Sequence, residues 1–176
     1  VTNNWIFLGF VAAFAVKAPL LPLHGWLRGA YTQAPPEVSA LLSGALLNCA
    51  FLGILRAWQV LLAAGLGDYG APILIGFGLV SMGVAALFLV GQADYKRLLA
   101  YSSVEHMGIL VFGAGIGGAA GFGAMFHAWN HSLTKAMLFL AAGNILAVYR
   151  TKSTTDANRL LHVLPVTGTL WVAGFL

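Results

Sequence analysis

The chain has 176 residues, of which 60% are apolar and only 8% are charged. Soluble domains carry about 25% charged residues, because their surfaces must face water. Together with a mean hydropathy of +0.86, this composition excludes an ordinary soluble domain and predicts that lipid surrounds most of the chain. The net charge of +4 comes from basic residues spread singly or in short clusters between apolar runs. That spacing is typical of membrane-protein loops and excludes a nucleic-acid-binding patch.

Apolar runs long enough to cross a bilayer, roughly 20 residues each, recur along the sequence. We predict an all-α integral membrane fold, a polytopic helix bundle with five complete spans and part of a sixth. The spans are expected at about residues 5–27, 37–60, 72–92, 98–115 and 121–149, with the truncated one at 165–176. The chain begins with Val1 and ends in an apolar run, so we expect residues 1–176 to be a fragment of one transmembrane domain.

The first span contains two prolines, Pro19 and Pro22. Each proline lacks an amide donor and clashes with the preceding helical turn, so the pattern predicts a helix that is discontinuous at 19–22. Irregular backbone at membrane depth is tolerated only where it faces protein or a water-filled cavity. His24 directly follows the break and is a candidate to gate access to it.

The basic residues predict the orientation of the spans. The predicted loops of one side hold Arg28, Lys96, Arg97, Arg150, Lys152 and Arg159. The other side holds Arg56, near a helix end, together with Asp68. The positive-inside rule therefore places the loops near 28–36, 93–97 and 150–162 in the cytoplasm.

Two patterns that bind cofactors in other proteins do not predict a cofactor here. Residues 113–118 match G-x-G-x-x-G, but that motif binds dinucleotides only between a strand and a helix. Between two membrane helices it predicts a tight turn and close helix packing. The single cysteine, Cys49, lies in an apolar run and cannot by itself hold an iron–sulfur cluster. We expect no redox centre or other cofactor in this chain.

Lys17 is the first candidate functional residue. It follows about twelve apolar or small residues, which places it roughly 18 Å along the span, close to the middle of the bilayer. A lysine that snorkels to the interface is the alternative, but apolar residues on both sides of Lys17 disfavour it. Because low dielectric weakens the preference of a lysine for its charged form, such a residue can take up and release a proton.

The fifth span carries His127, His131 and Lys135 at intervals of four residues. This spacing places the three side chains on one helical face, with Lys135 near the middle of the bilayer. We interpret the face as a proton path. Satisfied core histidines with a structural lysine are the alternative, and a metal site is disfavoured because no further ligand lies nearby in sequence.

Four polar residues of other spans complete the candidate set. Glu105 and His106 lie in the fourth span, where Glu105 serves either the proton path or the packing of a neighbouring helix. Ser43 and Asn48 lie in the second span and are expected to hydrogen-bond across helices or to hold water.

Three long motifs resemble one family, the antiporter-like membrane subunits of respiratory complex I and related complexes. The first is Val16–Leu27 with Ala34–Leu42, the second is Asp94–Gly108, and the third is Phe126–Phe139. Within this family the motifs are most similar to the hydrogenase-4 component F branch, which belongs to membrane-bound hydrogenase and formate hydrogenlyase complexes.

The resemblance implies a fold and residue roles. It implies inverted helical repeats, each with a discontinuous helix, in a bacterial or archaeal cytoplasmic membrane. It matches Lys17 to the lysine of the broken helix, Lys135 to the central lysine of the second repeat, and His127 and His131 to histidines of the polar axis. It also implies a glutamate partner for Lys17 on an earlier helix. The bridging lysine or histidine of related subunits is replaced by the region of Ser43 and Asn48, so water would have to bridge there.

These observations lead to one functional expectation. The chain is expected to be a proton-translocating membrane subunit of an oxidoreductase complex of the hydrogenase or NADH-quinone oxidoreductase type. Its partners are expected to be other membrane subunits and peripheral redox subunits, which hold nickel–iron, iron–sulfur or flavin centres. A sodium/proton antiporter subunit and a non-conducting structural subunit are the alternatives. A structural subunit needs no lysine at mid-bilayer, which costs about 3 kcal/mol on insertion scales.

Overall fold

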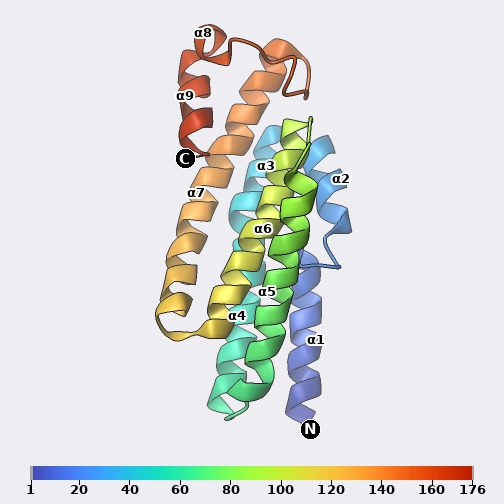
Figure 1. The fold of residues 1–176 in the computed structure, drawn as a ribbon, viewed down its shortest axis with the longest axis vertical. Coiled ribbons are helices and arrows are strands. Elements are labelled where there is room, and N and C mark those ends of the chain that lie inside the picture. Colours follow the sequence, from blue (N-terminus) through green and yellow to red (C-terminus); the bar gives the residue numbers. More distant parts are fainter. Residues whose placement is uncertain (1, 176) are drawn as a thin grey trace.

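The computed structural model describes residues 2–175, and the side chains of residues 4–175. Within that range the long elements of secondary structure are all helices (Figure 1). In chain order these are α1 (Thr2–Lys17), α2 (Gly25–Gln33), α3 (Pro36–Leu41), η1 (Leu42–Leu46), α4 (Leu47–Ala63), α5 (Gly67–Leu89), α6 (Tyr95–Ile116), α7 (Gly118–Tyr149), α8 (Leu160–Val163) and α9 (Pro165–Ala173).

Four helices of the described chain are long and apolar enough to cross a membrane. They run over Pro36–Ala63, Gly67–Leu89, Tyr95–Ile116 and Gly118–Tyr149, the first of them formed by α3, η1 and α4 together. These helices lie side by side and nearly parallel to the long axis of the molecule (Figure 1). The composition and the helix lengths thus agree on a multi-pass membrane protein.

The first apolar segment is divided into two helices, since α1 ends at Lys17 and α2 begins at Gly25. Backbone groups at the break, which lack helical partners, bind other parts of the protein. The Leu21 amide donates to the Ser81 hydroxyl of α5 at 3.0 Å, and the Trp26 indole of α2 donates to the Val16 carbonyl of α1 at 2.6 Å. The interruption therefore satisfies the requirement that irregular backbone at membrane depth has partners.

α6 lies at the centre of the bundle, between α5 and α7 (Figure 1). Glycines allow the close approach of α5 and α6, because a Cβ at Gly78 would lie 2.8 Å from the Gly108 carbonyl oxygen. The turn from α6 to α7 is also made by glycines, as Gly117 and Gly118 adopt positive φ angles of 75° and 52°. Residues 113–118 therefore form a helix end and a turn, in agreement with the prediction.

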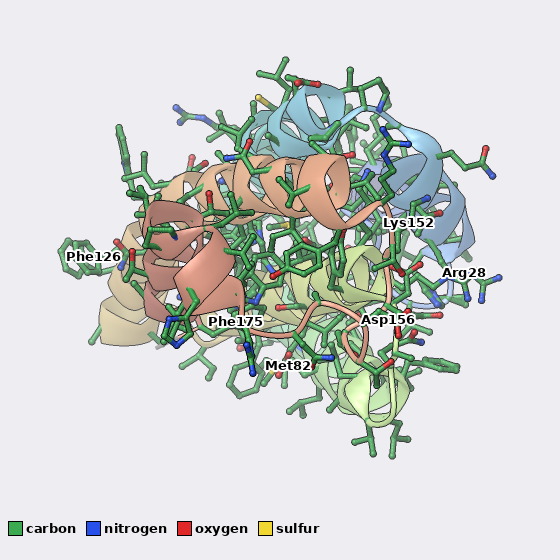
Figure 2. The ribbon with its side chains drawn as sticks, turned by 90° about the horizontal axis from the view of Figure 1, so that it is seen from above. Arg28, Met82, Phe126, Lys152, Asp156 and Phe175 are labelled. Atoms are coloured by element: carbon green, nitrogen blue, oxygen red, sulfur yellow. The ribbon has the colours of Figure 1, made fainter. Side chains whose placement is uncertain are left out.

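The segments 30–36, 93–97 and 150–156 meet at one end of the bundle. Tyr95 donates its amide to the Lys152 carbonyl at 3.1 Å, and its hydroxyl donates to the Thr151 carbonyl at 3.0 Å. Figure 2 looks onto this end and shows Arg28, Lys152 and Asp156 on the same side, with Phe126 pointing outward on the opposite side. The three loops predicted to share one side of the membrane thus contact one another directly.

The end of the described chain folds back along α7 (Figure 1). The predicted span at 165–176 corresponds to α9, which ends at Ala173. Thr167 of α9 is buried and accepts a hydrogen bond from the Asn144 amide of α7 at 3.4 Å. Trp171 packs edge-on against Tyr95, with 5.7 Å between ring centroids.

Candidate functional site

Lys135 lies at the contact between α7 and α6 and is only 2% exposed. Its ammonium group donates to the Ser102 hydroxyl at 2.7 Å and more weakly to the Leu99 carbonyl at 3.5 Å. Both acceptors belong to α6. Neutral oxygens thus hold a buried lysine, while Glu105 is half-buried on α6 and forms no ion pair with it in the described structure.

Three histidine rings continue from Lys135 along the same contact. His106 of α6 and His127 of α7 are joined by a ring-nitrogen contact of 2.9 Å. The ring centroids of His106 and His131 lie 5.3 Å apart. Both ring nitrogens of His131 are buried without a hydrogen-bond partner among the described residues. The histidines of two helices therefore form one row, in which a ring can pass a proton to its neighbour or to water.

A cavity of about 230 Å³ adjoins this row. Its polar lining comes from Ser102, His106, His127, Asn130, His131, Thr134 and Lys135, and Phe175 closes part of it. Since a water molecule occupies about 30 Å³ in the liquid, the cavity has room for several. Such waters would link the titratable groups where direct contacts are too long.

The histidine row does not have the geometry of a metal site. No group of three or more His, Cys, Asp or Glu residues suited to a metal ion occurs in the described part of the chain. The nitrogens of His106 and His127 face each other at 2.9 Å, a distance typical of a hydrogen bond.

The structure places Lys17 and His24 in a separate region. Lys17 ends α1, and its side chain is exposed on the surface of the described chain. His24 precedes α2 and is half-buried, with a ring nitrogen that has no partner among residues 4–175. Both residues flank the helix break, as the prolines predicted.

Ser43 and Asn48 link the second apolar helix to its neighbours. The Ser43 hydroxyl contacts the Ser103 hydroxyl of α6 at 3.0 Å. The Asn48 side-chain amide donates to the Ala128 carbonyl of α7 at 3.0 Å and to the hydroxyl of Ser132. Ser43 therefore contacts the helix that carries the acceptors of Lys135, whereas Asn48 contacts the helix that carries Lys135 itself.

Three polar residues that the sequence reasoning missed are buried near these groups. Lys96 is 2% exposed and donates to the Ala34 carbonyl just beyond α2 at 3.1 Å. Ser102 of α6 accepts a hydrogen bond from Lys135, and Ser103 of α6 contacts the Ser43 hydroxyl. The sequence placed Lys96 in a predicted loop at 93–97, next to Arg97. The consecutive serines in the middle of a membrane helix were the available signal for the other two.

Comparison with known proteins decides the family. The model of the NADH:quinone oxidoreductase/Mrp antiporter transmembrane family matches residues 1–176. The chain belongs to this family. The resemblance stated from the three motifs is thereby confirmed.

Relatives within the family carry several names. A hydrogenase-4 component F homolog of Methylacidiphilum infernorum is 44% identical over 97% of this chain and 36% of its own length. NADH-quinone oxidoreductase subunit M of Escherichia coli is 39% identical over 80% of this chain and 28% of its own length. The chain thus spans about a third of the length of these family members.

Two solved structures share the fold. A chain of the archaeal membrane-bound sulfane sulfur reductase, a respiratory membrane complex, superposes with a TM-score of 0.87 at 24% identity, covering 98% of this chain and 35% of that one. A chain of the Mrp complex from Dietzia superposes with a TM-score of 0.80 at 28% identity, covering 93% and 30%. The helix arrangement is therefore that of this family of antiporter-like membrane subunits.

Proposed function

We propose that this chain is part of a proton-translocating membrane subunit of a redox-driven complex, of the membrane-bound hydrogenase or NADH-quinone oxidoreductase type. The observation that carries the proposal is Lys135, which is buried between α6 and α7 and continuous with a row of three histidines and a polar cavity. A charge at membrane depth costs about 3 kcal/mol on insertion scales. A non-conducting structural subunit would gain nothing from that cost.

The proposed proton path runs along the α6–α7 contact. A proton enters at the half-buried His127, passes to His106 across their 2.9 Å contact, and reaches His131 and Lys135 through the cavity. Each transfer returns the donor to its neutral form, so the row can carry protons one after another. Lys135 is the storage site, because Ser102 and Leu99 solvate its ammonium form and burial favours its neutral form.

Lys17 is proposed as the coupling residue. Electron transfer in partner subunits, which would hold the nickel–iron, iron–sulfur or flavin centres, changes the charge near the helix break. The glutamate partner of Lys17 would lie on another helix of the full-length protein. The exposure of Lys17 on the described chain leaves its ammonium accessible to such a partner.

The proposal includes the arrangement in the membrane. The basic end formed by residues 28–36, 93–97 and 150–162 faces the cytoplasm, in accord with the positive-inside rule. The interrupted helix α1–α2 and the long helices are parts of inverted repeats that the full-length protein completes. The membrane is the cytoplasmic membrane of a bacterium or archaeon.

A sodium/proton antiporter subunit is the second candidate, favoured by the kinship with Mrp antiporters. Hard cations such as sodium prefer oxygen ligands, carboxylates above all. Among residues 4–175, those that line the cavity beside Lys135 include histidines and a lysine but no carboxylate. This lining favours protons over sodium, and proton uptake that is unchanged by sodium concentration would support the first candidate.

The test replaces Lys135 in the full-length protein of the assembled complex, reconstituted in vesicles. Lys135→Met removes the titratable group, and Lys135→Arg keeps a charge that does not release its proton at working pH. Both are expected to abolish coupled proton uptake, measured with a pH-sensitive dye, while electron transfer continues or slows. Arg56→Gln, at an exposed position of α4, is the control. Wild-type uptake by either Lys135 variant at normal abundance would remove Lys135 from the path.

A further inference from the structure

Tyr31 is a buried polar residue that the proton path described above does not use. It lies on α2, the second arm of the interrupted helix, and is fully buried. Its ring packs edge-on against Phe139 of α7, with 5.0 Å between centroids. Its hydroxyl has no hydrogen-bond partner within the described residues. Because a buried polar group without a partner costs free energy, such a group needs an explanation.

A pair of serines separates Tyr31 from the acceptors of Lys135. Ser43 lies one helical turn beyond Ser39, whose hydroxyl donates to the Tyr31 carbonyl at 3.3 Å, and the Ser43 hydroxyl contacts the Ser103 hydroxyl at 3.0 Å. Ser103 in turn donates to the Leu99 carbonyl at 3.0 Å. The same carbonyl accepts from Lys135. Polar groups thus lead from Tyr31 toward the ammonium of Lys135, with one bond missing at the Tyr31 hydroxyl, and we call Tyr31, Ser43 and Ser103 the hydroxyl row.

The direction of donation within the hydroxyl row follows from proton counting. A hydroxyl has one proton to donate and two lone pairs to accept with. Since Ser103 gives its proton to Leu99, it can only accept from Ser43. Ser43 has then used its own proton, and its lone pairs remain free to accept a hydrogen bond. The one missing bond is a donation from the Tyr31 hydroxyl to Ser43.

This direction has a consequence at Leu99. Its carbonyl oxygen already accepts the helical amide of Ser103, four residues later. The Ser103 hydroxyl and the Lys135 ammonium therefore compete for what remains of its two lone pairs. A donation from Tyr31 strengthens every bond of the row toward Leu99, because chained hydrogen bonds polarise one another. It thereby weakens the hold of Leu99 on the ammonium of Lys135.

We propose that Tyr31 is a positioning residue that links the helix break to proton release at Lys135. When α2 brings the Tyr31 hydroxyl onto Ser43, Lys135 loses part of its acceptor set and releases its proton. When α2 withdraws the hydroxyl, Leu99 is again available and Lys135 holds its proton. This inference rests on the proposed function, and it supplies the connection across Ser43 that no charged side chain provides.

A packing role for Tyr31 makes the opposite prediction. If the ring only fills space against Phe139, its hydroxyl is an unpaired buried group. Removing that hydroxyl while keeping the ring would then leave stability unchanged or raise it, and would leave transport unchanged. The two roles therefore differ in transport and agree in stability.

The experiment uses Tyr31→Phe in the assembled complex, reconstituted in vesicles. We expect the number of protons moved per electron to fall at least fivefold, with the abundance and the thermal midpoint of the complex unchanged. Ser43→Ala should cause the same loss, and Ser43→Thr, which keeps the hydroxyl, should restore transport. The double variant of Tyr31 and Ser43 should be no worse than either single variant, because both interrupt one row. Tyr101→Phe, at another buried tyrosine that is stacked on Phe88, is the matched control.

The comparison with Lys135→Met separates this inference from the proposed function. Wild-type transport by Tyr31→Phe, with transport lost in Lys135→Met, would overturn the role of Tyr31 and leave the proton path standing. Wild-type transport by Lys135→Met would overturn both. Loss in both variants, with Tyr101→Phe normal, supports both.

Discussion

The two lysines that the sequence placed at membrane depth have opposite surroundings. Lys135 is buried among groups of the described chain, held by Ser102 and adjoining three histidines. Lys17 lies on the exposed surface beside a helix break. A residue with a complete environment is suited to storing a proton. A residue that presents its charge outward is suited to responding to a partner. Two lysines predicted to lie at similar depth thus have different environments, which agrees with the different roles proposed for them.

The largest effect that tests this comparison is expected from Lys17→Ala in the full-length protein. Coupled proton uptake should be abolished while electron transfer persists or slows, because the charge that responds to the redox partner is gone. Proton uptake and electron transfer would be measured on the same preparation. Unchanged uptake would assign the coupling to another residue.

An intermediate effect is expected from His131→Phe, next to the proposed storage site Lys135. Proton uptake should fall about tenfold rather than vanish, because cavity waters bridge part of the gap between His106 and Lys135. The fold should tolerate the change, since both ring nitrogens of His131 lack partners among the described residues. His162→Phe, at an exposed position of α8, provides the comparison in the same transport assay. Equal uptake by the two variants would exclude His131 from the path.

The smallest effect is expected from Lys96→Met. Lys96 joins α6, the helix that binds Lys135, to the end of α2, the arm beyond the helix break. The Lys96 ammonium binds the Ala34 carbonyl at the end of α2, and a hydrogen bond to a charged group contributes about 2 kcal/mol. Its loss should speed amide hydrogen exchange in residues 25–34 and leave exchange in α6 and α7 nearly unchanged. Arg97→Met, at the exposed neighbouring position, should have little effect. Protection of α2 equal to that of the wild type would show that Lys96 does not fasten this arm.

Much of the fold follows from hydropathy and a few special residues. The apolar run at 37–60 lies within the continuous helix Pro36–Ala63, and the two prolines predicted the interruption that ends α1 at Lys17. The four-residue spacing of His127, His131 and Lys135 predicted a shared face, because helical geometry alone determines it. These signals are local, so a single sequence is enough to detect them.

Contacts between helices were harder to predict. His106 meets His127 across 2.9 Å, yet nothing in the spacing along one helix indicates which residues of another helix it faces. Lys96 is buried because two distant segments converge on it, whereas its charged neighbours suggested exposure. Tyr31 depends on the packing of α2 against α7, which brings together residues about a hundred positions apart. Such contacts arise from tertiary packing, and propensity does not encode them.

The bonds between α6 and α7 have a mechanical consequence. Glycines 117 and 118 join the two helices at one end, Tyr95 fastens α6 to the Thr151 carbonyl beyond α7 at the other, and Lys135 binds Ser102 between them. Sliding α7 by one turn would move Lys135 about 5 Å from its acceptor. The two helices are therefore tied at both ends and between them, so a slide of one turn would break the bond from Lys135 to Ser102.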